Sequence, residues 1–132
     1  MSKLSRRTLL ALLPLSILMA GTVSAAEIRP YDAQNFERLA QANRPILLAV
    51  HATWCPTCKA QGVVLDRLVK QPAWRDLTVM VIDFDTAKPL LRTLKVDDRA
   101  TLIAYHGRRE VGRSHLETEP AAIEALLKKT RS

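Results

Sequence analysis

Two short, continuous apolar segments, separated by an interval long enough for a helix, place the strongest constraint on the fold. The segments are PILLAVHA at 45–52 and LTVMVIDF at 77–84. Each has the length of a strand, and apolar residues at successive positions indicate that both faces of the strand are covered. The interval between them contains KAQGVVLDRLVKQ at 59–71, whose apolar residues recur at helical spacing. Strand, helix and strand in this order predict a sheet with a crossover connection.

Three other segments have the periodicity and the end signals of helices. They are residues 31–44, 85–95 and 118–130. Asp32 is placed to cap the first of them, and Thr118 is placed to cap the last. We expect these helices, together with the crossover helix, to cover both faces of the sheet.

Residues 100–113 have the pattern of a hairpin whose turn contains Gly107. The predicted order is therefore helix, strand, helix, strand, helix, hairpin and helix. This order predicts an α/β fold with a central mixed sheet, helices on both faces, and a C-terminal β-hairpin followed by a helix.

The first 25 residues have the pattern of a secretory signal peptide. Three basic residues and no acidic residue occupy positions 1–7, and an apolar run follows at 8–21. Val23 and Ala25 occupy the positions that a signal peptidase reads, so we expect cleavage after Ala25, with Ala26 as the second choice. The apolar run is shorter than the roughly 20 residues of a membrane-spanning helix, and a retained anchor is the alternative. The paired arginines allow export by the twin-arginine route as well as by the Sec route.

Removal of the signal peptide leaves one predicted domain, residues 26–132, which we place in the periplasm. The formal net charge falls from +7 to +4, because residues 1–25 contain three basic residues and no acid. The remaining basic residues are scattered, which excludes the basic stripe with stacking aromatics that nucleic-acid binding needs. No stable membrane span is expected after cleavage, and the domain is predicted to be a monomer.

Cys55 and Cys58 are the only cysteines, and they lie after the first apolar strand, where the next predicted helix begins. A sulfur at a helix start faces unpaired backbone N–H groups and the positive end of the helix dipole, and both stabilise a thiolate. Pro56 suits the first helical position. We therefore predict that Cys55 is an exposed, attacking thiolate and that Cys58, one turn later, resolves the mixed disulfide.

Metal binding is the alternative use of the two thiols. A structural zinc site needs four ligands, and His51, His106 and His115 do not have the spacing of a zinc finger. We therefore predict no bound metal and no cofactor beyond the cysteines, and we keep metal binding or delivery as the alternative function. Purely structural thiols are disfavoured, because Trp54 and Pro56 frame a loop.

The segment ILLAVHATWCPTCKA resembles the active-site segment of the thioredoxin superfamily, in which a strand, Trp-Cys-x-x-Cys-Lys and a helix follow one another. The resemblance covers residues 27–131 and includes exported bacterial members, such as the C-terminal domain of the transmembrane thiol:disulfide interchange protein. It implies a thioredoxin fold and thiol–disulfide exchange. It also implies that Cys55 is the nucleophile, that Cys58 resolves, and that Trp54 shapes the substrate surface.

Ala100 stands where the family has a cis proline that faces the cysteines. A non-proline cis bond costs about 3–4 kcal/mol, so we expect a trans bond between Arg99 and Ala100 and a loop that differs from the family's. If the loop can accept a cis bond, Ala100→Pro is expected to raise exchange activity. Arg99 is expected to place a charge near the cysteines. The predicted substrate surface consists of Trp54, Pro56, Thr57, Arg99, Ala100 and Thr101.

Thioredoxin also keeps a buried aspartate close to a lysine, and Ala49 and Val81 occupy those two places here. An unpaired buried charge is costly, so the loss of both partners together is coherent. No buried carboxylate is then available to take the proton from Cys58. Water or His51, which lies on the same strand face as Ala49, is the candidate proton shuttle.

These features predict a periplasmic thiol:disulfide oxidoreductase that acts on protein partners through a Cys-Pro-Thr-Cys pair. We expect it to act as a reductant, because the chain has no helical insertion of the size that dedicated periplasmic oxidants carry. Its expected partners are protein disulfides or dithiols and an upstream thiol–disulfide electron donor.

Overall fold

The structure is a computed structural model that describes residues 25–132. The predicted signal peptide, residues 1–25, lies outside the described residues except for its last residue. The described helices include none that is both long enough and apolar enough to cross a membrane.

A five-stranded mixed sheet forms the centre of the fold, with the strand order β1-β3-β2-β4-β5. β2 and β3 run parallel, and so do β3 and β1, whereas β4 and β5 are antiparallel to their neighbours. The strands are β1 (Glu27–Pro30), β2 (Pro45–His51), β3 (Thr78–Asp83), β4 (Thr101–His106) and β5 (Arg109–His115). The two strands predicted from the apolar segments are therefore central, and each has helices on both faces.

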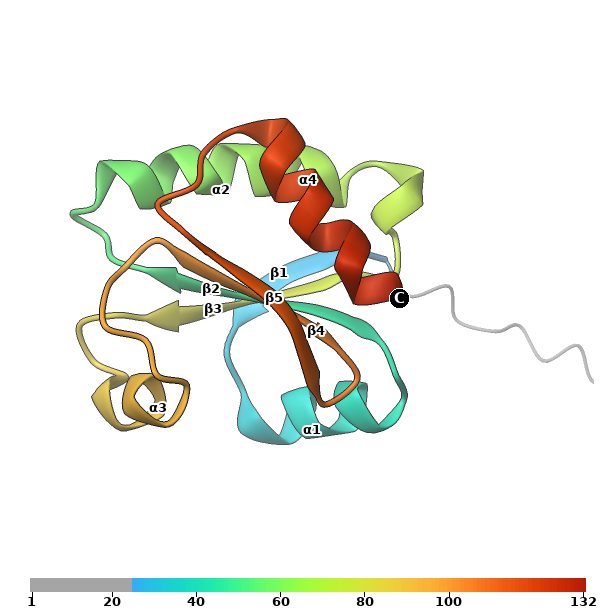
Figure 1. The fold of residues 1–132 in the computed structure, drawn as a ribbon, viewed down its shortest axis with the longest axis horizontal. Coiled ribbons are helices and arrows are strands. Elements are labelled where there is room, and N and C mark those ends of the chain that lie inside the picture. The colour runs from blue at the N-terminus through green and yellow to red at the C-terminus, as the bar shows by residue number, and fades with distance from the viewer. Residues whose placement is uncertain (1–24) are drawn as a thin grey trace, which may run out of the picture.

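Helices cover both faces of the sheet, with α2 and α4 on one side and α1 and α3 on the other (Figure 1). The helices are α1 (Ala33–Gln41), α2 (Pro56–Val69), α3 (Lys88–Thr93) and α4 (Pro120–Lys128). Two short 3-10 helices, Pro72–Trp74 and Lys129–Arg131, follow α2 and α4. The predicted α/β architecture, with its C-terminal hairpin and closing helix, is confirmed.

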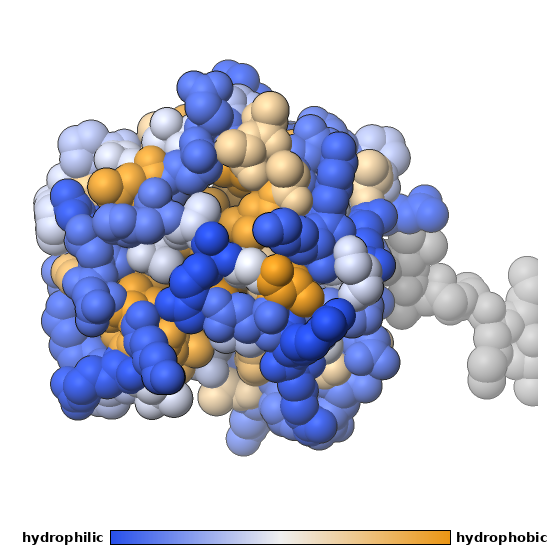
Figure 2. Space-filling model, viewed as in Figure 1, coloured by the Kyte–Doolittle hydropathy of each residue, from blue (hydrophilic) through white to orange (hydrophobic). Residues whose placement is uncertain are grey.

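Strand β2 supplies both cores, because successive side chains point to opposite faces of the sheet. Leu47 and Ala49 pack with α2 and α4, whereas Ile46, Leu48 and Val50 pack with α1 and α3. Every residue from Ile46 to Val50 is buried. The strand that leads to the cysteines is therefore fixed from both sides. The face of the molecule that Figure 2 shows is mainly hydrophilic, with apolar residues visible between the polar ones.

Two details differ from the sequence prediction. Strand β1 was not predicted, because its residues are mostly exposed and show no apolar alternation. Thr118 does not cap α4; the cap is Glu119, which makes no side-chain capping bond. The helix begins at Pro120, whose lack of an N–H group suits the first helical position, so the cap falls one residue later than predicted. Asp32 does cap α1, and its carboxylate accepts a hydrogen bond from the backbone N–H of Asn35 at 2.7 Å.

Candidate functional site

The two cysteines lie where the central strand β2 turns into helix α2. β2 ends at His51 and α2 begins at Pro56, so Cys55 is the capping residue of the helix. Its sulfur accepts a hydrogen bond from the backbone N–H of Cys58 at 3.1 Å. This N–H is one of the groups that a helix start leaves without a backbone partner. The predicted placement of a sulfur at a helix start is therefore present in the structure.

Both sulfurs are covered. Cys55 is 0% exposed and Cys58 is 2% exposed, and the two pack with Ala52 and Ala100. The expectation of an exposed Cys55 is wrong in this conformation, because its side chain turns back to cap its own helix and lies under the loop that contains Ala100. The thiol of Cys58 donates to the carbonyl of Val50 at 3.8 Å.

The environment moves the two thiol pKa values in opposite directions. Burial opposes the ionisation of Cys55, but hydrogen bonds from the thiol and the backbone N–H of Cys58, together with the charge of Arg99, outweigh it. The pKa of Cys55 is therefore below its usual value. Burial raises the pKa of Cys58, and the hydrogen bond between the two thiols raises it further. Cys55 is the group that ionises first, as the sequence predicts for the attacking residue.

Arg99 is held beside Cys55 by an ion pair. Its Nη1 donates to both carboxylate oxygens of Asp98, at 2.6 and 2.7 Å. Asp98 also accepts the backbone N–H of Arg99 at 2.8 Å and lies 3.3 Å from Nε2 of His115. The guanidinium lies over the ring of Trp54, 5.5 Å from its centroid. The prediction that Arg99 brings a charge to the cysteines is therefore supported by its position.

Trp54, directly before Cys55, is the large exposed aromatic side chain next to the motif. It is 56% exposed, and its Nε1 donates to Asp85 at 3.0 Å. Pro56 is also exposed, and Thr57 is half-buried. These three residues lie on the surface beside the motif, as expected. Thr101 differs, because it is buried and its hydroxyl donates to the carbonyl of Asp98 at 2.9 Å, which closes the loop.

Ala100, which stands where the family has a cis proline, has a trans peptide bond and a left-handed backbone conformation. The backbone of residues 25–132 contains no cis peptide bond, so the expected trans bond is confirmed. The φ of Ala100 is 56°, in the left-handed region that side chains with a Cβ rarely adopt. Its N–H donates to Val50 at 2.8 Å, and its carbonyl accepts the N–H of Leu116 at 2.9 Å.

Gln61 belongs to the site and was not predicted. It is 3% exposed on α2, and its Nε2 donates to the carbonyls of Ala100 and Glu117, at 3.0 and 2.8 Å. A signal was available in the sequence, because Gln61 interrupts the apolar stripe of α2 one turn after Cys58. A polar residue on a buried stripe needs a partner, but the stripe alone does not say which one.

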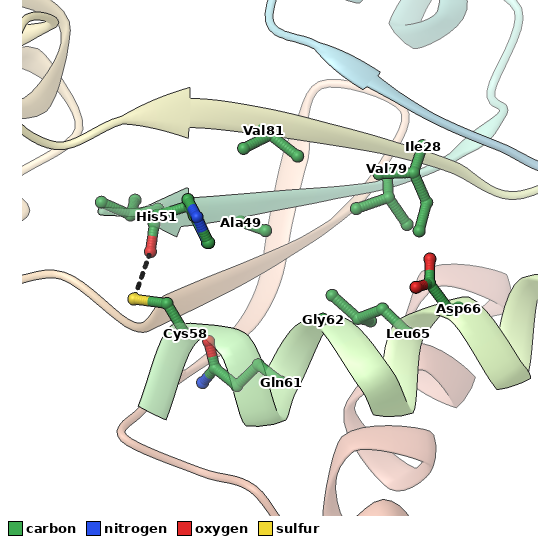
Figure 3. Close-up of a pocket in the computed structure, with 11 residues that line it drawn as sticks. Ile28, Ala49, His51, Cys58, Gln61, Gly62, Leu65, Asp66, Val79 and Val81 are labelled. Carbon is green, nitrogen blue, oxygen red and sulfur yellow. Dashed lines mark hydrogen bonds between the residues drawn. The ribbon is translucent and has the colours of Figure 1, made fainter. Parts of the chain in front are cut away.

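A cavity of about 230 Å³ lies between α2 and the sheet, and Cys58 and His51 line it (Figure 3). Ala49 and Val81 also line it, and they are direct partners across β2 and β3. The two positions at which thioredoxin has its buried aspartate and lysine are therefore neighbours here, and both are apolar. His51 lies at the strand end nearest Cys58, and Asp66 lies at the other end of the cavity (Figure 3). The role of His51 as a proton shuttle stays a prediction.

The two sulfurs have no companions for a metal site within the described part of the chain. No group of three or more histidine, cysteine or acidic side chains gathers there in a metal-holding arrangement. The alternative of metal delivery would therefore have to use the two thiols themselves.

Comparisons with known proteins agree on one family. The family model described as thioredoxin matches residues 27–129. The thioredoxin of Mycobacterium tuberculosis is 33% identical over 95 residues, which are 72% of this chain and 81% of that protein. The crystal structure of Trxlp from Edwardsiella tarda has a TM-score of 0.73 and 40% identity, and the match covers 76% of this chain and 98% of that one. The thiol:disulfide interchange protein DsbE of Pasteurella multocida is 41% identical over 56 residues, only 29% of its length.

Replacement of Arg99 tests the electrostatic part of the site. Arg99→Gln is expected to raise the pKa of Cys55, because it removes a positive charge that favours the thiolate. The midpoint of the alkylation rate of Cys55 against pH should then move upward, because less thiolate is present at any given pH. The control is Arg108→Gln, which breaks an ion pair with Glu37 away from the cysteines. An equal shift in both variants would show that the effect is not local.

For the replacement of Ala100 by proline, the structure predicts a loss of activity, the opposite of the gain expected from the sequence. Proline cannot adopt a φ of 56°, and it lacks the N–H that bonds to Val50. We expect Ala100→Pro to lower stability by more than about 1 kcal/mol and to reduce exchange activity. Ala100→Gly is the matched control, since glycine adopts this conformation without strain. Urea unfolding and turnover of a disulfide substrate measure both effects, and a gain of activity with proline would contradict the structure.

Proposed function

Because this chain belongs to the thioredoxin family, we propose that it reduces protein disulfides in the periplasm through Cys55 and Cys58. Thiol:disulfide oxidoreductase activity is the chemistry of this family and of its homologues, and the chain is such an oxidoreductase. The compartment, the direction of electron flow and the partners are the parts that we propose.

The observation that carries the proposed residue roles is the capped helix start. The sulfur of Cys55 accepts the N–H of Cys58, and the pKa of Cys55 is lowered while that of Cys58 is raised. A thiolate is the form that attacks a disulfide, and a protonated second thiol does not compete with it. The two sulfurs therefore have distinct roles before any partner binds.

In the first step the Cys55 thiolate attacks one sulfur of the partner's disulfide. A bond forms between Cys55 and that sulfur, the partner's sulfur–sulfur bond breaks, and the other partner sulfur leaves as a thiolate. Because Cys55 has no exposed surface in this conformation, docking of the partner has to displace part of its cover. The covering loop at Ala100 and the side chain of Arg99 are the adjacent elements.

In the second step Cys58 loses its proton and attacks the sulfur of Cys55. The bond between Cys55 and Cys58 forms, and the second partner sulfur leaves as a thiolate that takes up a proton from the solvent. The pair has then lost two electrons and the partner has gained them. His51 and the cavity lie beside Cys58, and they offer the route by which its proton leaves.

Trp54 and Arg99 are the side chains placed to meet the partner. Trp54 offers a large exposed aromatic surface next to the motif, and its bond to Asp85 fixes its orientation. Arg99 lies over that ring, so the two form one surface beside Cys55. We assign this surface to the recognition of the chain around the partner's disulfide.

The amino-terminal pattern and the connections of the fold support the proposed compartment and direction. Residues 1–25 have the charge, apolar run and small-residue end of a signal peptide. Among the described residues, α2 leads to β3 through a single short 3-10 helix, with no inserted helical unit. An insertion of that kind is what we would expect of a dedicated periplasmic oxidant.

Cysteine variants test the proposed roles of the sulfurs. Cys55→Ser is expected to abolish reduction of insulin disulfides with dithiothreitol as the electron source, because no attacking thiolate remains. Cys58→Ser is expected to keep the first step and to accumulate mixed disulfides, which non-reducing gels would show. Retained turnover in Cys55→Ser would refute the assignment of Cys55. Release of partners at the normal rate from Cys58→Ser would refute the resolving role of Cys58.

Compartment and direction can be tested together in a Gram-negative host. Thiols are trapped with acid, labelled with a maleimide that adds mass, and examined in the periplasmic fraction. We expect a form that lacks residues 1–25 and keeps both cysteines reduced at steady state, because an upstream donor supplies electrons. The purified pair should have a potential near the roughly −270 mV of thioredoxin, and a value near −120 mV would indicate an oxidant. A full-length form, or a permanently oxidised pair, would contradict the proposal.

A further inference from the structure

Gln61 is a buried polar side chain on the same helix as the motif. It lies one turn after Cys58 and is 3% exposed, among residues of α2 that otherwise pack apolar side chains on the sheet. Burial of an amide is unfavourable unless its hydrogen bonds are made. Gln61 makes two from its Nε2, to the carbonyls of Ala100 and Glu117, at 3.0 and 2.8 Å. Both carbonyls belong to segments far away in the sequence.

The first of these carbonyls belongs to the loop that covers the sulfurs. Ala100 has a φ of 56° and Leu116 has a φ of 57°, so both take the left-handed conformation that residues with a Cβ avoid. The N–H of Leu116 donates to the carbonyl of Ala100 at 2.9 Å, and Gln61 donates to the same oxygen. An unfavourable backbone conformation persists only where its surroundings hold it in place.

The second carbonyl, that of Glu117, belongs to the connection between β5 and α4. Glu117 follows Leu116 directly, so the amide of Gln61 joins the two unusual backbone segments to each other and to α2. Gln61 and Cys58 lie on the same helix, near its start (Figure 3). A change in the position of Ala100 is therefore linked through one side chain to the helix that carries the resolving sulfur.

The position of Ala100 matters to both thiols. Ala100 packs against Cys55 and Cys58, and its backbone limits the rise that burial causes in the pKa of Cys58. Arg99, its neighbour in the chain, lowers the pKa of Cys55. Displacement of Ala100 would alter the cover of the sulfurs and the distance of the guanidinium at once.

We propose that Gln61 is a positioning residue for the thiol pair: it ties the Ala100 loop to the motif helix, so that the sulfurs stay covered and Arg99 stays beside Cys55. Its hydrogen bonds restrain this loop, which has an alanine at its centre where the family has a proline. The proposal rests on the proposed function only in so far as the thiols are the reacting groups.

The test replaces the amide by an apolar side chain of similar length. Gln61→Met removes both donors and adds no charge. We expect the pKa of Cys55 to rise, by less than in Arg99→Gln, as the guanidinium moves away, and the thiolate absorbance of the reduced protein against pH measures it. In a Cys55→Ser background, we also expect Cys58 to be alkylated faster at a pH above its pKa, because its cover is looser.

Two controls separate positioning from general stability. Leu68→Ala, on the same helix, removes a buried core side chain away from the loop, and it is expected to lower stability without moving the pKa of Cys55. Adding Ala100→Gly to Gln61→Met should return the pKa part of the way, because glycine adopts the left-handed conformation without strain and depends less on the tether. Gln61→Asn, which keeps the amide but is too short for both carbonyls, serves if Gln61→Met does not fold.

A folded Gln61→Met or Gln61→Asn protein with an unchanged pKa of Cys55 and unchanged alkylation of Cys58 would overturn the proposal. Shifts of equal size in Leu68→Ala would overturn it as well, since they would reflect loss of stability alone. Failure of the proposed function is distinguishable, because it would appear as a lack of disulfide exchange in the wild-type protein, whatever the Gln61 variants do.

Discussion

The hydrogen bond from the backbone N–H of Cys58 to the sulfur of Cys55 is the interaction on which the rest of the site depends. It exists because β2 is fixed by two cores and delivers the chain to the start of α2 in one place. The same bond caps the helix and stabilises a thiolate, so local folding and reactivity have a common cause. It also turns the side chain of Cys55 inward, which explains why the sulfur is covered although the motif follows the end of the central strand β2.

The loop opposite the cysteines shows how one substitution is accommodated by several contacts. A proline would fix this backbone by its ring, whereas Ala100 depends on its neighbours. Its N–H bonds to Val50, and its carbonyl bonds to Leu116 and to Gln61. These bonds occupy the polar backbone groups of Ala100, and Asp98 occupies the N–H of Arg99. A partner's backbone therefore finds few free groups to pair with at Ala100, which favours the proposed recognition by the side chains of Trp54 and Arg99.

The sequence predicted those elements whose apolar residues form a continuous or periodic pattern. It did not predict the elements whose structure depends on contacts with distant segments. The apolar runs that became β2 and β3 have the length and composition of covered strands, and the interval between them has helical spacing. Strand β1 carries no such pattern, because it is an edge strand defined by its pairing with β3. In the site, the positions of Cys55 and Cys58 followed from local order along the chain. The two hydrogen-bond partners of Gln61, Ala100 and Glu117, lie about 40 and 55 residues after it in the chain, so no local pattern specifies them. The left-handed conformation of Ala100 likewise depends on contacts with distant segments.

The apolar pair Ala49 and Val81 changes the second step of the exchange. A buried aspartate and lysine would have to be removed from water together, and the cost of their desolvation competes with their attraction. The two apolar side chains carry no such cost, but neither supplies a carboxylate beside Cys58, whose pKa burial raises. The cavity beside it, of about 230 Å³, is larger than the roughly 30 Å³ that one water molecule occupies in the liquid. The cavity therefore has room for water beside Cys58, which supports our proposal that the proton of this thiol leaves by way of solvent or His51.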